Sequence, residues 1–347
     1  MTRPLGGAAQ ADVNRQWVLA QRPIALPKCD DFALIESAIE QPDVGQVLLR
    51  THYLAMDPAI RNVLGQGGAY AVPLPLGQPV RGMVLGEVVA SQDAALRVGD
   101  FAWGFGTWSD YVCVPAAGLV RVPASDDLAL HLHCYGTIGL TAAYGLFDIA
   151  QMQSGDTVLV TGAAGAVGSL VGQLARAAGA SRIVGIAGGQ AKCARAVQDY
   201  GYDLCLDYKA DPDLGASVLG SFPNGIDVVF DNVGGEQLEI AIEAIAKDGR
   251  IALCGMISGY GVEDPQPGPA NLWNLVARTA QMRGFRVTDV LANDQWRQDF
   301  LAPIADLVAA GTLQADLDIR EGLEQVPSAF AALFMGTNSG RLLVRLP

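Results

Sequence analysis

Three glycines, each separated from the next by two residues, follow a short apolar run and are the strongest chemical signal in the chain. They are Gly162, Gly165 and Gly168, directly after residues 157–161. In a strand, turn and helix of this kind, the first glycine allows the turn, the second lets backbone approach a pyrophosphate, and the third permits close packing. The helix N-terminus offers N–H groups to the anion. The motif predicts a dinucleotide site at Gly165, Ala166, Val167, Gly168 and Ser169, and a purely steric glycine turn is the alternative.

The next strand indicates which nicotinamide dinucleotide the site favours. An NAD site carries Asp or Glu about 20 residues after the glycines, where the carboxylate binds the ribose 2′-hydroxyl. Here the end of that run, residues 186–190, holds no carboxylate, and Lys192 follows, with Arg195 one turn later. Lys192, with Arg195 as a second candidate, therefore predicts a 2′-phosphate and NADPH rather than NADH. A solvated lysine in the first turn of a helix is the other interpretation.

A hydride-transferring enzyme also needs a group that polarises the substrate carbonyl. Zinc does this in many dehydrogenases, but His52, His131 and His133 are the only histidines, they lack metal-ligand spacing, and the cysteines are scattered. We therefore expect no metal and assign the role to tyrosine hydroxyls. Tyr260 follows the fifth expected strand, where doubly wound sheets hold ligands, and Tyr53 follows a β run of the first domain. An ordinary half-buried tyrosine is the alternative for each.

The expected secondary-structure elements that hold these residues change in sequence pattern once along the chain. Up to about residue 123, short β-like runs are separated by Gly, Pro and Asp, which predicts a compact β-rich module. From about residue 156 to 287, apolar runs alternate with amphipathic stretches, the βαβ pattern of a doubly wound (Rossmann) parallel sheet. The expected strands are residues 157–161, 183–186, 204–206, 228–230, 251–254 and 285–287.

The end of the chain carries a helical pattern after residue 292 and a final β run at residues 341–346. We expect this tail to rejoin the β-rich module. The predicted domains are therefore residues 1–130 with 308–347, and the Rossmann domain 131–307. His131 and His133 then fall in a turn at the domain boundary rather than in a metal site.

Composition excludes several classes of protein. The 347 residues are half hydrophobic, enough for two packed domains. Lys and Arg number 23 against 36 Asp and Glu, and the net charge of −13 argues against nucleic acid as a partner. No apolar run is long enough to span a membrane, residues 1–14 do not read as a targeting signal, and the six cysteines include no C-x-x-C pair. We expect a cytoplasmic globular protein with free thiols.

Several separate stretches resemble one family: the zinc-independent branch of the medium-chain dehydrogenase/reductases, in the prostaglandin reductase, alkenal double-bond reductase and curcumin reductase group. The resemblance runs from Trp17 to Leu346. In the wider superfamily a Gly-His-Glu triplet brings zinc ligands, whereas the similar place here reads Gly82-Met83-Val84. The stretches are YLAMDP (53–58), the segment 104–111 with WSDY, GLTA (139–142), GAVGSLVGQLA (165–175), FDNVGG (230–235), CGMIS (254–258) and GTNSG (336–340).

The resemblance implies a GroES-like first domain completed by the tail, and a homodimer formed by edge-to-edge pairing of the sixth strands around Phe285. It places Ala166 to Ser169 at the pyrophosphate, and Lys192 and Tyr208 at the 2′-phosphate end. The further cofactor contacts that it implies are Asn232, Cys254, Ser258, Tyr260, Phe285, Arg286, Val287 and Asn338. One departure is Ala59, where the group usually carries Tyr after Asp-Pro, so we expect a wider or differently shaped substrate pocket.

The expected function is that of an NADPH-dependent ene-reductase acting on the C=C bond of α,β-unsaturated ketones or aldehydes. Tyr260 and Tyr53 are the predicted catalytic hydroxyls. Reduction of quinones with the same cofactor is the nearest alternative, and reversible oxidation of an allylic alcohol is another. A protein that binds NADPH without turnover is the alternative from a different class.

Overall fold

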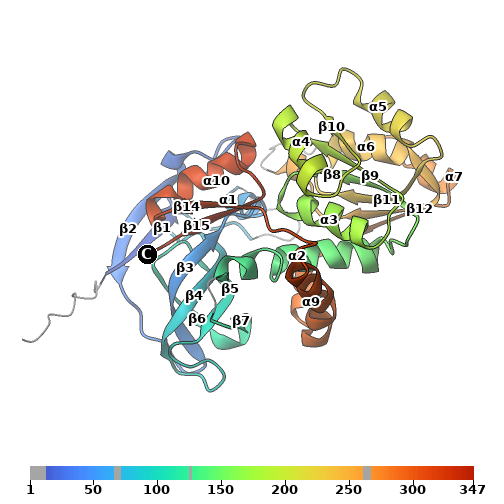
Figure 1. Cartoon of the computed structure of the whole chain (residues 1–347). Coiled ribbons are helices and arrows are strands. Elements are labelled where there is room, and N and C mark those ends of the chain that lie inside the picture. Colours follow the sequence, from blue (N-terminus) through green and yellow to red (C-terminus); the bar gives the residue numbers. More distant parts are fainter. Residues whose placement is uncertain (1–12, 66–71, 125–126, 261–266) are drawn as a thin grey trace, which may run out of the picture.

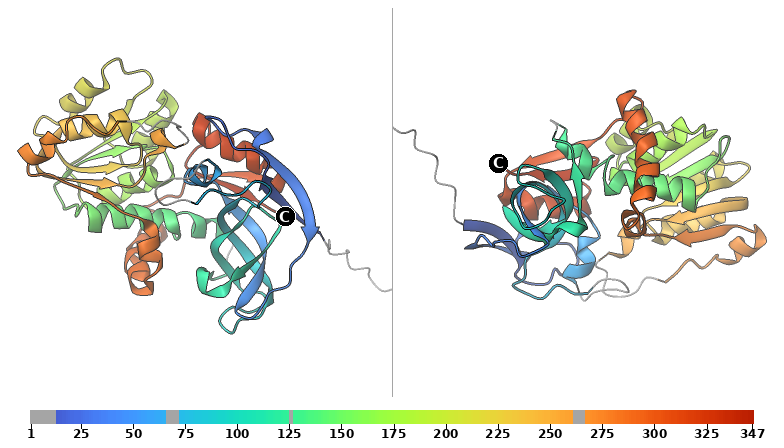
Figure 2. Two further views of the ribbon diagram at one scale, coloured as in Figure 1. Left: turned by 180° about the vertical axis from the view of Figure 1, so that it is seen from behind. Right: turned by 90° about the horizontal axis from the view of Figure 1, so that it is seen from below.

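The computed structural model of the chain describes residues 13–65, 72–124, 127–260 and 267–347. A mainly antiparallel sheet and a parallel sheet form two bodies, each with its own core (Figure 1). Helix α2 (Thr137–Ala143) continues as a π-helical turn, η4 (Tyr144–Ile149), and leads into the second body, as the view from behind in Figure 2 shows. The predicted combination of a β-rich module and a doubly wound parallel sheet is confirmed.

The β-rich domain is built from both ends of the chain. Its main sheet runs β14 (Leu317–Glu321), β15 (Arg341–Arg345), β3 (Gln46–Ala55), β4 (Arg81–Ser91), β5 (Phe101–Thr107) and β7 (Leu119–Val122), with β6 (Tyr111–Pro115) on β3. Strands β1 (Val13–Leu19) and β2 (Phe32–Ala38) form a separate antiparallel pair, and the helices are α1 (Ile60–Leu64) and α10 (Val326–Met335). Trp108 lies in the core of this domain and packs against Phe32 of β2 and Phe330 of α10. Tail and N-terminal residues therefore share one core.

The parallel sheet runs β10 (Leu204–Asp207), β9 (Arg182–Ala187), β8 (Thr157–Thr161), β11 (Ile226–Asp231), β12 (Ile245–Leu253) and β13 (Gln281–Gly284). The order reverses between β8 and β11, so the ligand crevice of such a sheet lies at their carboxyl ends. Along β8, Val158 and Val160 face one core and Leu159 faces the other. The remaining helices are α3 (Ala166–Ala177), α4 (Gln190–Asp199), α5 (Leu214–Ser221), α6 (Gly235–Glu243), α7 (Trp273–Ala277), α8 (Val287–Leu291) and α9 (Asp294–Ala309).

The sixth strand was predicted wrongly at residues 285–287. Strand β13 ends at Gly284, and Arg286 is already the N-cap of α8. The Phe285 ring lies 6.1 Å from that of Phe230 and 5.6 Å from that of Tyr144, so this apolar residue anchors the turn after the strand. The strand itself is mostly exposed, which is typical of an edge strand and leaves no apolar pattern to read.

The chain returns to the β-rich domain through a short connection. Helix α9 ends at Ala309 and Leu313 still packs in the core of the parallel sheet, beyond the predicted boundary at residue 307. Strand β14 begins at Leu317, so residues 314–316 make the crossing. Further along, Gly340 forms a parallel β-bridge with Gly165. The tail therefore touches the glycine turn itself.

His133 is buried at the junction of the two domains. It follows the 3-10 turn η3 (Leu128–Leu132), which contains His131, and it is fully inaccessible to solvent. Neither ring nitrogen has a hydrogen-bond partner among the described residues. Burial and the nearby Arg341 guanidinium lower the pKa of His133 to about 3. The imidazole is therefore neutral in the folded protein at neutral pH.

This burial predicts acid sensitivity of the folded state. Below pH 6.5 the unfolded chain binds a proton that folded His133 rejects down to about pH 3, so stability falls as pH falls. At pH 5 this costs about 2 kcal/mol. We expect His133→Leu to remove this contribution to the pH dependence of the free energy of unfolding, measured by urea unfolding between pH 7 and 5. His52 and His131, whose pKa values burial also lowers, keep a residual slope, and an unaltered slope in the variant would contradict the assignment.

Candidate functional site

The glycine turn lies at the carboxyl end of β8, in the crevice between the two halves of the parallel sheet. Gly162 has a φ of +65°, a conformation that favours glycine. A Cβ on Gly168 would lie 2.3 Å from the carbonyl oxygen of Gly162, so only glycine lets helix α3 begin this close to the strand. Helix α3 starts at Ala166 without a side-chain cap, because its N-cap is Gly165. The N–H groups of its first turn thus point to the crevice.

Lys192 lies in the first turn of α4, beside the crevice. Its side chain is half-buried, and its ammonium lies 3.8 Å from where a Cβ on Gly336 would be. Burial and the neighbouring Lys209 ammonium lower the pKa of Lys192. A lysine whose pKa is lowered by burial and by a neighbouring cation marks a place that a bound anion would stabilise. Lys209 was missed in the sequence, because it joins Lys192 only through the pairing of β9 with β10.

The turn between β9 and α4 is organised from the next strand. The carboxylate of Asp207 accepts hydrogen bonds from the backbone N–H groups of Gly189, at 2.7 Å, and Lys209, at 3.1 Å. The ring of Tyr208 lies against Gly188, where a Cβ would be 2.7 Å from it, and Lys209 lies 6.0 Å from the ring centroid. The structure therefore brings Tyr208 and Lys192 to one end of the crevice, and their contact with a 2′-phosphate stays a prediction.

Arg195, the second candidate for the 2′-phosphate, pairs with other residues of the protein. Its guanidinium forms an ion pair with Asp316 at 3.0 Å and another with Asp199 at 3.3 Å. It also donates to the hydroxyl of Ser339. Its charge is therefore compensated by the protein, and binding of the 2′-phosphate by Arg195 stays a prediction that these contacts do not favour.

The loops after β11 and β12 form the other side of the crevice. Asn232 packs against Gly162, where a Cβ would lie 3.5 Å from the Asn232 Cβ, and its amide donates to the backbone oxygen of Thr161 at 2.8 Å. The hydroxyl of Ser258 donates to the backbone oxygen of Val233 at 2.6 Å. Asn232 and Ser258 therefore lie on two touching loops next to the glycine turn.

Asp231 holds these loops and was missed in the sequence. It is fully buried at the end of β11, and its carboxylate accepts hydrogen bonds from Thr161 at 2.6 Å and from the N–H of Gly234 at 3.0 Å. Burial raises its pKa, and these hydrogen bonds oppose the change. Burial beside Asp231 also raises the pKa of Cys254 to about 12, so that thiol stays protonated. A carboxylate directly after a buried strand was the signal that could have found it.

The two candidate tyrosines lie in different places. The Tyr260 oxygen accepts a hydrogen bond from the N–H of Met256 at 3.5 Å, and it is 3.4 Å from where a Cβ on Gly255 would be. The same Gly255 Cβ position is 3.3 Å from the backbone oxygen of Asn232, so Tyr260 lies beside the crevice. Tyr53 pairs across the sheet with Arg345, and its side chain contributes to the raised pKa of that exposed arginine. The structure does not bring Tyr53 to the crevice.

The last predicted contacts come from the segment after β13 and from the tail. Phe285 is packed against the core, whereas Arg286 is exposed and forms an ion pair with Asp289 at 3.0 Å. Val287 is the first residue of α8. The Asn338 amide donates to the backbone oxygen of Gly340, whose bridge to Gly165 places Asn338 near the glycine turn.

The described residues contain neither a candidate metal site nor a candidate membrane span. No group of three or more His, Cys, Asp or Glu that could hold a metal occurs among them. Within the same ranges, every helix falls short of the length and hydropathy that a membrane crossing requires. All six cysteines are free.

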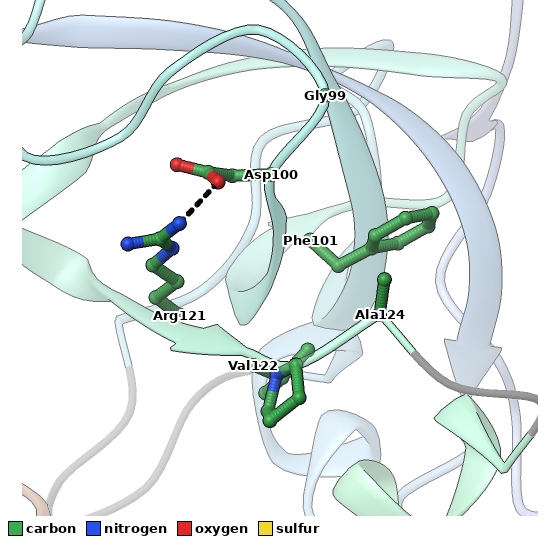
Figure 3. Close-up of a pocket in the computed structure, with 7 residues that line it drawn as sticks. Gly99, Asp100, Phe101, Arg121, Val122 and Ala124 are labelled. Atoms are coloured by element: carbon green, nitrogen blue, oxygen red, sulfur yellow. Dashed lines mark hydrogen bonds and ion pairs between the residues drawn. The ribbon is translucent and has the colours of Figure 1, made fainter.

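A hollow of about 420 Å³ lies elsewhere, at the start of β5 and the end of β7, two paired strands of the antiparallel sheet (Figure 3). Asp100 and Arg121 point toward one another across it and form an ion pair at 2.6 Å, so their charges satisfy each other. A second hollow, of about 320 Å³, borders Tyr208 on the outer side, between the first turns of α5 and α6. Only the second adjoins the crevice that the glycine turn defines.

Known proteins match this chain over nearly its whole length. A family model described as the N-terminal domain of oxidoreductase matches residues 15–122, and one described as zinc-binding dehydrogenase matches 166–306. The NADPH-dependent curcumin reductase of Escherichia coli is 34% identical over 97% of this chain and 98% of its own. The 2-alkenal reductase (NADP(+)-dependent) of Nicotiana tabacum is 32% identical over 95% and 97%. The crystal structure of CurA in complex with NADPH from Vibrio vulnificus has a TM-score of 0.89 at 34% identity and covers 96% of this chain and 99% of its own.

A β-rich domain joined to a doubly wound sheet with a glycine turn at its crevice defines a dinucleotide-binding oxidoreductase. The chain belongs to the medium-chain dehydrogenase/reductase family, in the group that holds the curcumin, 2-alkenal and prostaglandin reductases. The predicted family is confirmed.

Proposed function

We propose that the protein is an NADPH-dependent reductase of carbon–carbon double bonds conjugated to a ketone or aldehyde. The observation that carries this proposal is the full-length similarity to relatives named as reductases of curcumin and of 2-alkenals. The crevice fits the cofactor for two reasons. Gly168 has no Cβ that would fill the place where the helix and the turn meet, and Lys192 and Lys209 form a cationic end. NADPH supplies a hydride for the β-carbon of the substrate, and the α-carbon takes a proton.

The residues of the chain divide this work between them. The first turn of α3, from Ala166 to Ser169, holds the pyrophosphate, and Lys192 with Tyr208 holds the 2′-phosphate end. Asn232, Cys254, Ser258, Phe285, Val287 and Asn338 line the remainder of the cofactor groove. Tyr260 donates its hydroxyl proton in a hydrogen bond to the carbonyl oxygen, where negative charge develops during reduction. No metal ligand is needed for this, and Ala59, which is exposed after Pro58, leaves room for a bulky enone.

The test is turnover by the purified protein with NADPH and a panel of one enone, one 2-alkenal and one quinone. We expect NADPH oxidation with the enone and the alkenal, with reduction of the C=C bond shown by product mass and NMR. A chelator is expected to leave the rate unchanged. Turnover of the quinone alone would instead favour the quinone reductase, and tight NADPH binding without turnover of any of the three would favour a binding protein.

Lys192 gives the sharpest test of cofactor choice. We expect Lys192→Gln to raise the Kd for NADPH about tenfold to a hundredfold, because a charge-assisted contact to the 2′-phosphate is lost, and to change the Kd for NADH little. Fluorescence titration of both cofactors measures this. Lys247→Gln, an exposed lysine on β12, is the matched control. Equal losses for both cofactors would remove Lys192 from phosphate recognition.

The assembly and its compartment are further parts of the proposal. Strand β13 is the edge of the parallel sheet, and the neighbouring helix α7 exposes Trp273 and Val276. A second copy would cover this edge by strand pairing and make a homodimer. Light scattering that gives a monomer would contradict it.

The six free thiols agree with a reducing compartment such as the cytoplasm. Thiol titration of the purified protein is expected to find all six cysteines free.

A further inference from the structure

Asp316 is the centre of a polar cluster where the chain crosses between the domains. Its carboxylate accepts hydrogen bonds from the hydroxyls of Tyr200, at 2.5 Å, and Ser339, at 2.9 Å, and it forms the ion pair with Arg195. The side chain of Asp316 is only 12% exposed. The pKa of Asp316 is lowered, because these hydrogen bonds and the Arg195 charge outweigh its burial. Three segments distant in sequence therefore meet at one carboxylate.

The crossing itself is pinned to the Rossmann domain. The side-chain amide of Gln173, on α3, donates to the backbone oxygen of Gln314 at 3.1 Å and accepts from its N–H at 2.7 Å. The backbone of Gly340 lies so close to Asp316 that a Cβ there would be 2.4 Å from the Asp316 backbone oxygen. Residues 314–316 and 339–340 are thus one packed unit on α3 and α4.

This unit fixes the loop 336–340 along helix α4. At one end Gly336 lies beside Lys192, and at the other end Ser339 receives a hydrogen bond from Arg195, one turn further along the same helix. Gly340 then bridges to Gly165 in the glycine turn. The loop therefore joins the two places where the cofactor phosphates are expected, and Asn338 lies within it.

We propose that Asp316 is a positioning residue for cofactor selectivity, which together with Arg195, Tyr200 and Ser339 holds the loop 336–340 against α4. The loop and Lys192 then close from both sides around the 2′-phosphate of NADPH. This inference rests on the proposed use of NADPH. Because NADH has no 2′-phosphate, a displaced loop weakens NADPH binding and changes NADH binding much less. Arg195 acts through Asp316 and Ser339 and not by contact with the phosphate.

Asp316→Asn separates this role from a purely electrostatic one. The substitution removes a negative charge near the phosphate and releases Arg195, so simple electrostatics predicts tighter NADPH binding. Loss of position predicts the opposite: we expect the Kd for NADPH to rise about tenfold, the loss of a charge-assisted contact, with the Kd for NADH changed by less than about twofold. The two explanations therefore differ in sign.

The experiment measures Kd for both cofactors by fluorescence titration on the wild-type protein, Asp316→Asn, Arg195→Gln and the double variant. We expect both single variants to lose NADPH affinity and the double variant to lose no more than either alone. Asp100→Asn, which changes an ion pair outside the crevice in the same way, is the control. Should Asp316→Asn not fold, Ser339→Ala removes one hydroxyl of the cluster and is expected to raise the Kd for NADPH about threefold.

Several outcomes would overturn the proposal. Tighter or unaltered NADPH binding in Asp316→Asn would show that the cluster does not position the loop, and equal losses for NADPH and NADH would show a general structural role. Wild-type protein that does not bind NADPH would overturn the proposed function, and the positioning role with it. NADPH binding by the wild type together with an unaffected Asp316→Asn leaves the proposed function standing and removes only Asp316.

Discussion

Replacement of Tyr260 by phenylalanine is expected to lower kcat for an enone about a hundredfold, with a smaller change in KM. The Tyr260 oxygen accepts a hydrogen bond from the N–H of Met256, which holds the phenol beside the crevice, and a phenol can donate as well as accept a hydrogen bond. The loop that carries it packs on Asn232, next to the glycine turn. A hydroxyl held there stabilises the negative charge on the carbonyl oxygen in the transition state more than the neutral carbonyl of the substrate. Steady-state kinetics at saturating NADPH measures the effect.

The matched control for this variant is Tyr111→Phe. Tyr111 lies on β6 of the antiparallel sheet, so it loses the same hydroxyl away from the crevice. We expect its kcat to equal that of the wild type. Unaltered turnover in Tyr260→Phe would remove this residue from the mechanism. A loss of NADPH affinity that matches the loss of kcat would assign Tyr260 to cofactor binding instead.

The parts of the site that could be predicted from the sequence are those that local backbone geometry demands. The glycines of the turn were found because helix and strand approach closely there, and a Cβ on Gly168 would collide with Gly162. Lys192 was found because it follows the second strand at the distance that the fold prescribes. In each case the residue and its reason lie within one βαβ unit.

The parts that were missed depend on contacts between segments far apart in the chain. Arg195 looked like a phosphate ligand because its partner Asp316 lies in another element. Lys209 joins Lys192 only when β10 pairs with β9. Tyr53 is the first residue of a family motif, yet it pairs with Arg345 on a neighbouring strand of the antiparallel sheet. The charge of a residue and its position in the sequence identify candidate ligand-binding residues. Contacts between distant segments then decide which of these charges are available to bind a ligand.

The glycine turn gives the largest expected loss of cofactor binding. In Gly168→Ala the new Cβ would lie 2.3 Å from the Gly162 oxygen and 2.8 Å from the Cα of Ala163. Both are backbone atoms, so the start of helix α3 must move away from the turn. Such overpacking costs about 1–3 kcal/mol of stability. The N–H groups of the first turn no longer point to one pyrophosphate position, and we expect the Kd for NADPH to rise at least about a hundredfold, as two or more charge-assisted hydrogen bonds weaken.

Titration of NADPH and thermal unfolding of the same samples separate these two effects. Gly220→Ala is the matched control, because Gly220 lies in α5 of the same domain and a Cβ there meets no atom within 4 Å among the described residues. Alanine at that position is expected to stabilise the helix slightly and to leave the Kd unchanged. Normal NADPH binding by a folded Gly168→Ala protein would mean that the turn tolerates a wider approach. The proposal that Gly168 sets the position of the phosphate-binding N–H groups would then be wrong.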